Sequence, residues 1–317
     1  MSTASKILLI AACTLSLASL GAVNETAGTT GFNALKIVYS ARAIALGEAL
    51  TGEVQSPDGL FFNPAAIIRI GRNEAGTTYS NYFLDAQGGQ VQYLYPRNKF
   101  IAWGFALKYL NLGSMDRTEV DATGDLIETG ETFGAYNLIA SGSVSHYISD
   151  AIDLGGTVKV IYDMIDDSSA TAALVDIGMI HHPANERIKV GVAIRNFGTQ
   201  LSYYTDNKYK EKLPLTFAAG LSYRLNDQIF TSLDLNKSNG ENFEGKLGIE
   251  YSLYPSLDLR LGFRTSAADQ NLGGSFGWAS GFSLGAGWKW HNYRLDYGLS
   301  SYGDLGFINQ LSLNYEF

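Results

Sequence analysis

Few residues of this chain have the types and spacing that catalysis or metal binding requires. His146 and His291 each lie near a serine or an aspartate, but proximity in sequence does not place a base within reach of a nucleophile. His181 and His182 are adjacent, and adjacent side chains of a strand point to opposite faces, which disfavours a shared metal ion. We therefore expect no enzymatic activity, no metal site and no cofactor.

Two further groups of residues have a structural interpretation. Asp163, Asp166 and Asp167 could offer oxygen atoms to Ca²⁺, but they lack the glycine and the bidentate glutamate of an EF-hand, so we predict a solvated loop. The glycines at 273, 274, 277, 285 and 287 match no phosphate-binding pattern. Such glycines in strands indicate bends or close packing.

Charged residues also stand at alternate positions of apolar segments. In 257–264 and 293–300, leucine, tyrosine and phenylalanine alternate with charges, glycine and serine. This alternation gives a strand one apolar and one polar face. We expect the polar faces to line a lumen, whose charged residues include Glu250, Arg260, Arg264, Arg294 and Asp296.

The C-terminal segment 307–317 (FINQLSLNYEF) has the same two faces and ends on an aromatic residue. A two-faced strand that closes on a terminal Phe suggests a bacterial outer-membrane β-barrel, whose outward residues meet lipid. Tyr315 and Phe317 are the predicted C-terminal insertion signal. A soluble β-sandwich could show the same alternation, so the other segments must decide.

Residues 1–22 are typical of a secretory signal peptide, with Lys6 as the only charge before an apolar run that reaches Leu20. Cleavage after Ala22 would remove Cys13, the only cysteine, and leave no disulfide or thiolate. The net charge of −8 argues against nucleic acid as a partner. No other run approaches the ~20 apolar residues of a spanning helix, so a membrane form would be a barrel.

About fourteen alternating segments follow from residue 74, separated by turn signals. They are 77–84, 89–95, 100–110, 134–148, 152–164, 170–182, 187–197, 213–225, 228–236, 243–253, 257–266, 278–290, 293–300 and 307–317. The even number, the aromatic content and the terminal Phe favour an all-β fold, a transmembrane antiparallel β-barrel, over a sandwich.

Connection lengths support the same fold. Tight turns are predicted at 96–99, 149–151, 226–227 and 255–256, and long loops at 111–133, 198–212, 236–242 and 267–277. Short periplasmic turns and longer extracellular loops are typical of these barrels. The tryptophans are interpreted as aromatics of the membrane interface: Trp103, Trp278, Trp288 and Trp290.

Residues 23–73 do not alternate and are expected to form a small N-terminal helical plug inside the barrel of residues 74–317. The segment 41–50 predicts a short helix that ends near Gly52, and a turn follows at 56–59. A fourteen-stranded barrel encloses space that such a segment could fill. The predicted plug, ligand or gate residues are Phe61, Phe62, Asn63, Pro64 and Ala65.

Together these features resemble the PorV/PorQ family of FadL-like outer-membrane barrels. Members tend to open with a segment like Ser40 to Gly47 (SARAIALG), followed by a loop and an aromatic-Asn-Pro-Ala stretch, here FNPA from Phe62. The likeness extends over the leader, the plug, the strand number and the aromatic end. This chain departs from the family at Glu48 and Ala66, where members usually have glycine.

The resemblance implies two different roles. PorV-like members act with the type IX secretion system and bind or shuttle cargo, so our main expectation is a binding role with secretion-system subunits and secreted cargo as partners. FadL-like members pass hydrophobic small molecules, which is the first alternative. A structural barrel without transport is the second. In each case we expect the protein in the outer membrane of a Gram-negative-type bacterium, in contact with its lipid, after signal-peptide cleavage.

Overall fold

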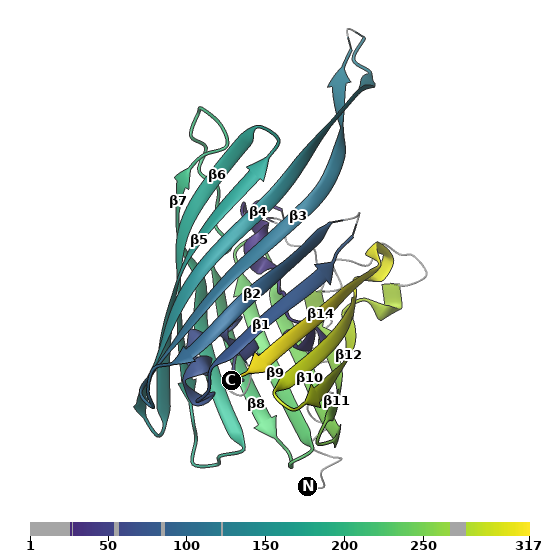
Figure 1. Ribbon diagram of the computed structural model, residues 1–317. Helices are drawn as coiled ribbons and strands as arrows, with labels where there is room; N and C mark the ends of the chain where they lie inside the picture. The colour runs from purple at the N-terminus through teal and green to yellow at the C-terminus, as the bar shows by residue number, and fades with distance from the viewer. Residues whose placement is uncertain (1–25, 27, 54–56, 84–85, 122, 267–276) are drawn as a thin grey trace.

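The computed structural model describes residues 26, 28–53, 57–83, 86–121, 123–266 and 277–317. In this part of the chain, fourteen antiparallel strands close into a barrel in which β14 pairs with β1 (Figure 1). The expected all-β barrel and its strand number are confirmed. The strands are β1 (Glu74–Asn81), β2 (Gln87–Pro96), β3 (Ile101–Val120), β4 (Leu126–Ser149), β5 (Ile152–Ile165), β6 (Ser168–His181), β7 (Ile188–Ser202), β8 (Thr216–Arg224), β9 (Ile229–Ser238), β10 (Phe243–Tyr254), β11 (Leu257–Arg264), β12 (Phe282–Trp290), β13 (Tyr293–Ser301) and β14 (Phe307–Glu316).

The barrel has an apolar outer face and a polar inner face. On β14 the side chains of Leu311 and Leu313 are 48% and 44% exposed, whereas Ser312 and Asn314 are buried. Exposed large apolar side chains also cover the outer face of the other strands, which a soluble protein would bury instead. The inner face is apolar only in part, as at Leu174 and Ile180 on β6, where residues 32–66 pack against the wall. Such an outer surface is stable against lipid, so the strands span a membrane. None of the described helices is long and apolar enough to cross one.

The two ends of the barrel differ. One end, here called the short-turn end, carries the tight turns predicted at 96–99, 149–151, 226–227 and 255–256, which the structure places at 97–100, 150–151, 225–228 and 255–256. At the opposite, long-strand end, the predicted loop 111–133 is wrong, because most of it continues β3 and β4 as a projecting two-stranded ribbon (Figure 1). Both faces of this ribbon are largely exposed, which explains why it lacks the apolar alternation of the membrane-spanning part.

The other predicted loops begin later than expected or fall outside the described residues. β7 continues to Ser202 and β9 to Ser238, which leaves connections at 203–215 and 239–242. Of the predicted loop 267–277, only Gly277 is described, as the start of the short helix η6 (Gly277–Ala279). The predicted signal peptide also lies outside the described residues.

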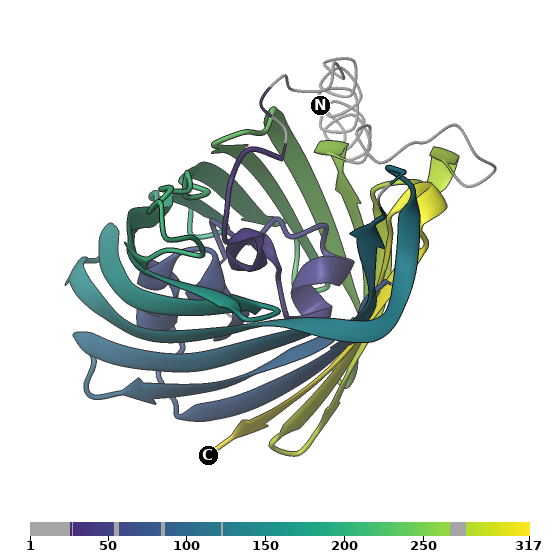
Figure 2. The same cartoon turned by 90° about the horizontal axis from the view of Figure 1, so that it is seen from above.

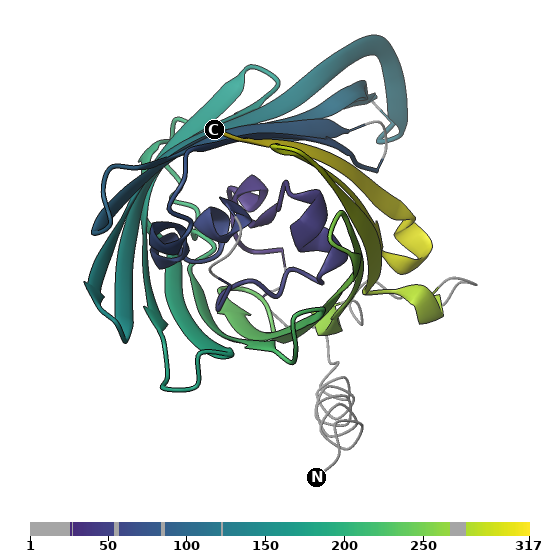
Figure 3. The same ribbon diagram turned by 60° about the horizontal axis from the view of Figure 1, so that its bottom comes forward.

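The described residues 28–53 and 57–73, here called the plug, lie inside the barrel (Figures 2 and 3). The plug contains η2 (Asn33–Lys36), α2 (Ala41–Ala45), η3 (Pro57–Phe61) and η4 (Pro64–Arg69). Thr30 bridges to Lys212 at the long-strand end, and Arg69 reaches Asp153 near the short-turn end, with 2.6 Å between Nε and Oδ2. The plug therefore runs along the lumen from one end to the other.

The helix α2 is shorter than predicted, ending at Ala45 and not at Leu50. It begins where the Ser40 hydroxyl accepts a hydrogen bond from the Ala43 N–H (3.0 Å). It ends because Gly47 adopts a φ of 61° and the following N–H of Glu48 donates to the Ala43 carbonyl (2.8 Å). A Cβ at Gly47 would also lie 2.7 Å from the backbone of β10 and β11, so only glycine fits there.

Glycines on the inner face of the barrel let the plug pack closely. At each of eight wall positions an added Cβ would collide with a plug atom: Gly155, Gly178, Gly191, Gly220, Gly248, Gly262, Gly285 and Gly298. The close packing predicted for Gly285 is thus found, against Ala45. Side chains at these positions would push the plug away from the wall, so the plug explains the glycines at these eight positions.

Aromatic side chains form a band near the short-turn end. The rings of Trp288 and Trp290 stack with 6.4 Å between their centres. The ring centres of Tyr293 and Tyr315 are 4.7 Å apart, and those of Tyr315 and Phe317 are 4.9 Å apart. Such a band is typical of the membrane interface. Trp278, in contrast, lies in η6 and outside β12.

Candidate ligand-binding site

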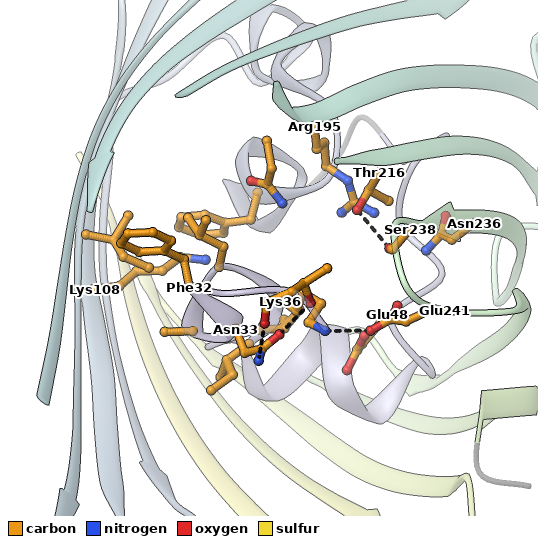
Figure 4. Close-up of a pocket in the computed structure, with 18 of the residues that line it drawn as sticks. Phe32, Asn33, Lys36, Glu48, Lys108, Arg195, Thr216, Asn236, Ser238 and Glu241 are labelled. Atoms are coloured by element: carbon orange, nitrogen blue, oxygen red, sulfur yellow. Dashed lines mark hydrogen bonds and ion pairs between the residues drawn. The ribbon is translucent and has the colours of Figure 1, made fainter. Parts of the chain in front are cut away.

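A cavity of ≈ 1010 Å³ occupies the lumen between the plug and the long-strand end (Figure 4). Its walls come from η2, from the plug residues Glu48 and 60–62, and from the inner faces of β3 to β11. The volume is sufficient for a drug-sized molecule. The lining is mixed, since apolar side chains alternate with charged and amide groups.

The apolar part of the cavity gathers around three phenylalanines of the plug. Phe32 and Phe62 are almost fully buried, and Phe61 packs against two clusters of buried hydrophobic residues. The ammonium of Lys108 lies 4.2 Å from the centre of the Phe61 ring, and the guanidinium of Arg195 lies 5.8 Å from that of Phe62. Each cation therefore stands beside an aromatic surface.

Lys108 and Arg195 differ from the other cations of the cavity. Lys159 pairs with Asp176 (2.8 Å), and Lys36 pairs with Glu241 (2.7 Å). No ion pair joins Lys108 or Arg195 to a carboxylate within the described residues, and Nε of Arg195 is buried without a hydrogen-bond partner there. Figure 4 shows both side chains reaching toward the cavity from different parts of the wall. An anionic group could bind at either.

Glu48 is the acidic residue that the plug presents to this cavity. Its Oε2 lies 2.8 Å from Nζ of Lys246 on β10, and its Oε1 lies 2.9 Å from Nη1 of Arg264 on β11. Glu48 has a φ of 61°, a left-handed conformation that costs a residue with a side chain about 1–2 kcal/mol. The two ion pairs hold it in this conformation.

The five predicted gate residues divide into two groups. Phe61 and Phe62 line the cavity, whereas Asn63, Pro64 and Ala65 do not. Asn63 is buried; its Nδ2 donates to three carbonyls, of Thr51, Met179 and Val192, at 3.0–3.3 Å, and its Oδ1 accepts from the Ala65 N–H. The Ala65 carbonyl accepts from Ser145 (3.0 Å). The Asn-Pro-Ala stretch therefore fixes the plug to the wall.

The predicted lumenal charges all point inward, and four of them form one network with the plug. Glu250 accepts from Arg42 of the plug (3.0 Å) and from Arg260 (2.7 Å). Arg260 also binds Asp296 (2.7 Å), and Asp296 binds Arg294 (2.7 Å), which lies 3.3 Å from Asp58 of the plug. Of the five predicted lumenal charges, only Arg264 lines the cavity.

The remaining polar candidates are separate from the cavity or from one another. His182 pairs with Asp153 (2.7 Å) beside Arg69, while the neighbouring His181 binds the Ala151 carbonyl. Asp163 is buried in β5 and lines the cavity, which corrects its predicted place in a solvated loop. No group of three potential metal ligands occurs in the described ranges.

Sequence reasoning missed Lys108 and Glu48 and did not single out Arg195. Lys108 and Arg195 occupy polar-face positions of alternating segments, so a search for charges on that face would have found them. Glu48 carries no such signal, because the predicted helix ran through it. Its position depends on the turn at Gly47.

The chain matches none of the known protein families, and no protein of curated function matches it. Several solved structures have the same fold. A FadL homologue from Pseudomonas aeruginosa has a TM-score of 0.59 and 13% identity, and the match covers 88% of this chain and 98% of the other. The toluene transporter TbuX of Ralstonia pickettii has a TM-score of 0.61 and 12% identity over the same shares. The toluene transporter TodX of P. putida has a TM-score of 0.59 and 10% identity, and the match covers 88% of this chain and 98% of the other. At these identities the likeness shows the fold, that of a FadL-like barrel.

Proposed function

We propose that this protein is an outer-membrane channel for small amphiphilic molecules that combine an apolar body with an acidic group. The observation that carries the proposal is the cavity, in which Lys108 and Arg195 form no ion pair with a carboxylate of the described residues and stand beside Phe61 and Phe62. Both side chains are half-buried, and a cation that is partly withdrawn from water without a counter-ion is stabilised by an anionic ligand. The aromatic side chains would hold the apolar part.

The similar structures support the class of function. Two of them are named as toluene transporters and another as a monoaromatic hydrocarbon channel. The cavity of this protein carries more charge than a neutral aromatic hydrocarbon needs, which is why we propose an acidic amphiphile.

The direction of passage follows from the ends of the barrel. Short turns face the periplasm in proteins of this type, so the cavity would face the outside and the plug would lie between it and the periplasm. Residues 1–22 would direct export and be removed. The fixed plug implies that passage requires plug movement.

Binding of dodecanoate, compared with neutral dodecanol, tests the proposal. We expect Lys108→Met and Arg195→Met in lipid nanodiscs to weaken dodecanoate binding about tenfold each, as loss of a charge-assisted contact predicts, and to leave dodecanol binding nearly unchanged. Lys99→Met is the matched control, because Lys99 also lies over an aromatic ring, Phe100, but outside the cavity. Equal dodecanoate affinity in all four proteins, or no binding, would overturn the proposal.

A PorV/PorQ-like role in type IX secretion stays a prediction that rests on the resemblance alone. A pull-down of the tagged protein from solubilised outer membrane, with mass spectrometry of proteins and lipids, distinguishes the roles. Secreted proteins that share a C-terminal domain, or secretion-system subunits, would support secretion. A stoichiometric amphiphile without them would support uptake.

A further inference from the structure

The cavity contains a second anion-binding position that is already occupied by the protein itself. Lys246 and Arg264 both line the cavity, and between them they bind the two carboxylate oxygens of Glu48. Arg264 is further oriented by Ser300 (3.1 Å) and Tyr302 (3.2 Å), and its Nε has no hydrogen-bond partner among the described residues. Two neighbouring cations of the fixed wall thus hold one carboxylate of the plug.

Glu48 is held in a backbone conformation that is unfavourable for a residue with a side chain. Its φ of 61° follows directly on Gly47, also at 61°. Beyond it, residues 49–53 connect to the wall through the Thr51 N–H, which donates to Asp234 (2.9 Å). Loss of the two ion pairs would free a strained turn at the centre of the plug.

We propose that Lys246 and Arg264 form a second site for the acidic group of the transported ligand, beyond Lys108 and Arg195, and that Glu48 is an internal stand-in which the ligand displaces. Displacement releases the turn at 46–48 and loosens the plug at residues 46–53. Binding of the acidic group is in this way coupled to opening. The inference rests on the proposed function, and it adds a position where the ligand acts on the plug.

Competition between Glu48 and the ligand has measurable consequences. While Glu48 occupies the two cations, it lowers the apparent affinity for any other carboxylate. A ligand with the same apolar body and no charge cannot compete for them. Only an acidic ligand should therefore loosen the plug.

The test combines hydrogen–deuterium exchange of the plug with native mass spectrometry of bound ligand, in nanodiscs at a pH where dodecanoate is ionised. Dodecanoate should raise amide exchange in residues 46–53 of the wild type, and dodecanol should not. Glu48→Gln should bind dodecanoate about tenfold more tightly than the wild type, because the internal competitor is gone. Glu48→Gly removes the carboxylate as well, and glycine adopts the left-handed backbone of this position without strain. Both variants should show raised amide exchange in residues 46–53 before ligand is added, and dodecanoate should raise it little further.

Glu244→Gln and Glu250→Gln are the matched controls. Glu244 lines the same cavity and binds the same Lys246 (3.1 Å), but it belongs to the wall. Glu250 joins plug to wall through Arg42, yet lies outside the cavity. Glu48→Gln should have two effects: it should bind dodecanoate more tightly, and amide exchange in residues 46–53 should already be raised so that dodecanoate no longer increases it. Neither control variant should show both effects. A Glu244→Gln variant that did so would overturn the inference, since general loss of negative charge would then explain the result.

The two proposals fail in different ways. Dodecanoate that binds the wild type without changing exchange in 46–53 would overturn the displacement of Glu48 and leave the proposed function intact. Dodecanoate that does not bind at all would overturn both.

Discussion

The side chain of Asn63 fills the space left open by Gly178 on β6. A Cβ on Gly178 would collide with Oδ1 of Asn63 and lie 2.8 Å from Cδ of Pro64. Because of this close approach, Nδ2 of Asn63 reaches carbonyls of two wall strands, at Met179 on β6 and Val192 on β7. One buried amide group thus fixes the plug to the barrel through bonds that a larger wall residue would prevent.

Asn63→Asp keeps the size of the side chain and the oxygen that caps η4, but it removes the donor and buries a charge. We expect the plug to become sensitive to protease while the barrel stays folded, with a destabilisation of about 1–3 kcal/mol for the lost buried bonds. Limited proteolysis, together with heat-dependent gel mobility, measures the two effects. Asn98→Asp is the control, since the exposed Asn98 uses only its side-chain oxygen, toward Phe100 and Ile101. Equal protease resistance of the two variants would contradict this role of Asn63.

The ion pair of Arg42 and Glu250 offers a second test of plug docking. Without Arg42, Glu250 keeps its contact with Arg260 (2.7 Å), and without Glu250, Arg42 keeps Glu53 (3.7 Å). Arg42→Met and Glu250→Gln should therefore each lower the free energy of unfolding by about 1.5–3 kcal/mol, the range for one charge-assisted hydrogen bond. The double variant should lose less than the sum, because the two single variants remove the same ion pair. Denaturant unfolding in micelles, followed by tryptophan fluorescence, measures these energies. Arg72→Met is the control: Arg72 and Glu316 form an exposed pair (2.7 Å) worth at most about 1 kcal/mol. Strict additivity would show that the pair does not act as a unit.

The barrel could be predicted from the sequence because lipid enforces a strict alternation. Residues such as Leu259 and Leu261 must face outward while Asp258 and Arg260 face inward, and this period marks each membrane-spanning strand. The alternation stops where the strands leave the membrane. The ribbon of β3 and β4 beyond Asn111 is largely exposed on both faces, so its strands carried no alternation and were predicted as a loop.

The site was harder to predict, because it depends on contacts between distant segments. The charges of the polar faces could be assigned to the lumen, but their partners could not. Arg42 meets Glu250 across 208 residues, and Glu48 meets Lys246 across 198. Glu48 reaches the cavity only because the helix ends at Ala45 and the chain turns at Gly47. A local pattern of helix-favouring residues gave no sign of that stop.

Phe317 is expected to act in assembly as the end of the insertion signal. It is 66% exposed, contacts Tyr315 and Tyr93 on the outer surface, and donates its backbone N–H to Asn73 (3.1 Å). Phe317→Ser should therefore reduce the amount of heat-modifiable protein in the outer membrane several-fold. Phe307→Ser is the matched control, because Phe307 is an exposed aromatic residue at the other end of the same strand. Equal amounts of assembled protein for Phe317→Ser and Phe307→Ser would contradict a special role of Phe317 in assembly.

Glu48 makes the stability of the plug dependent on acid. Burial alone would raise the pKa of its carboxyl group, but the attraction of Lys246 and Arg264 outweighs burial and lowers the pKa from 4.5 to about 2. A lowered pKa in the folded state means that the stabilisation is complete above pH 4.5 and is lost as the pH falls toward and through about 2.

We therefore expect the difference in unfolding free energy between the wild type and Glu48→Gln to stay constant from neutral pH down to about pH 5. It should then shrink as the pH approaches 2, because the wild-type carboxylate becomes protonated and loses its attraction to the two cations. Denaturant unfolding of both proteins at stepped pH measures this difference, and the subtraction removes the titration of every other acid. A difference that stays flat through the acid range would mean that the two cations do not stabilise the charged form of Glu48.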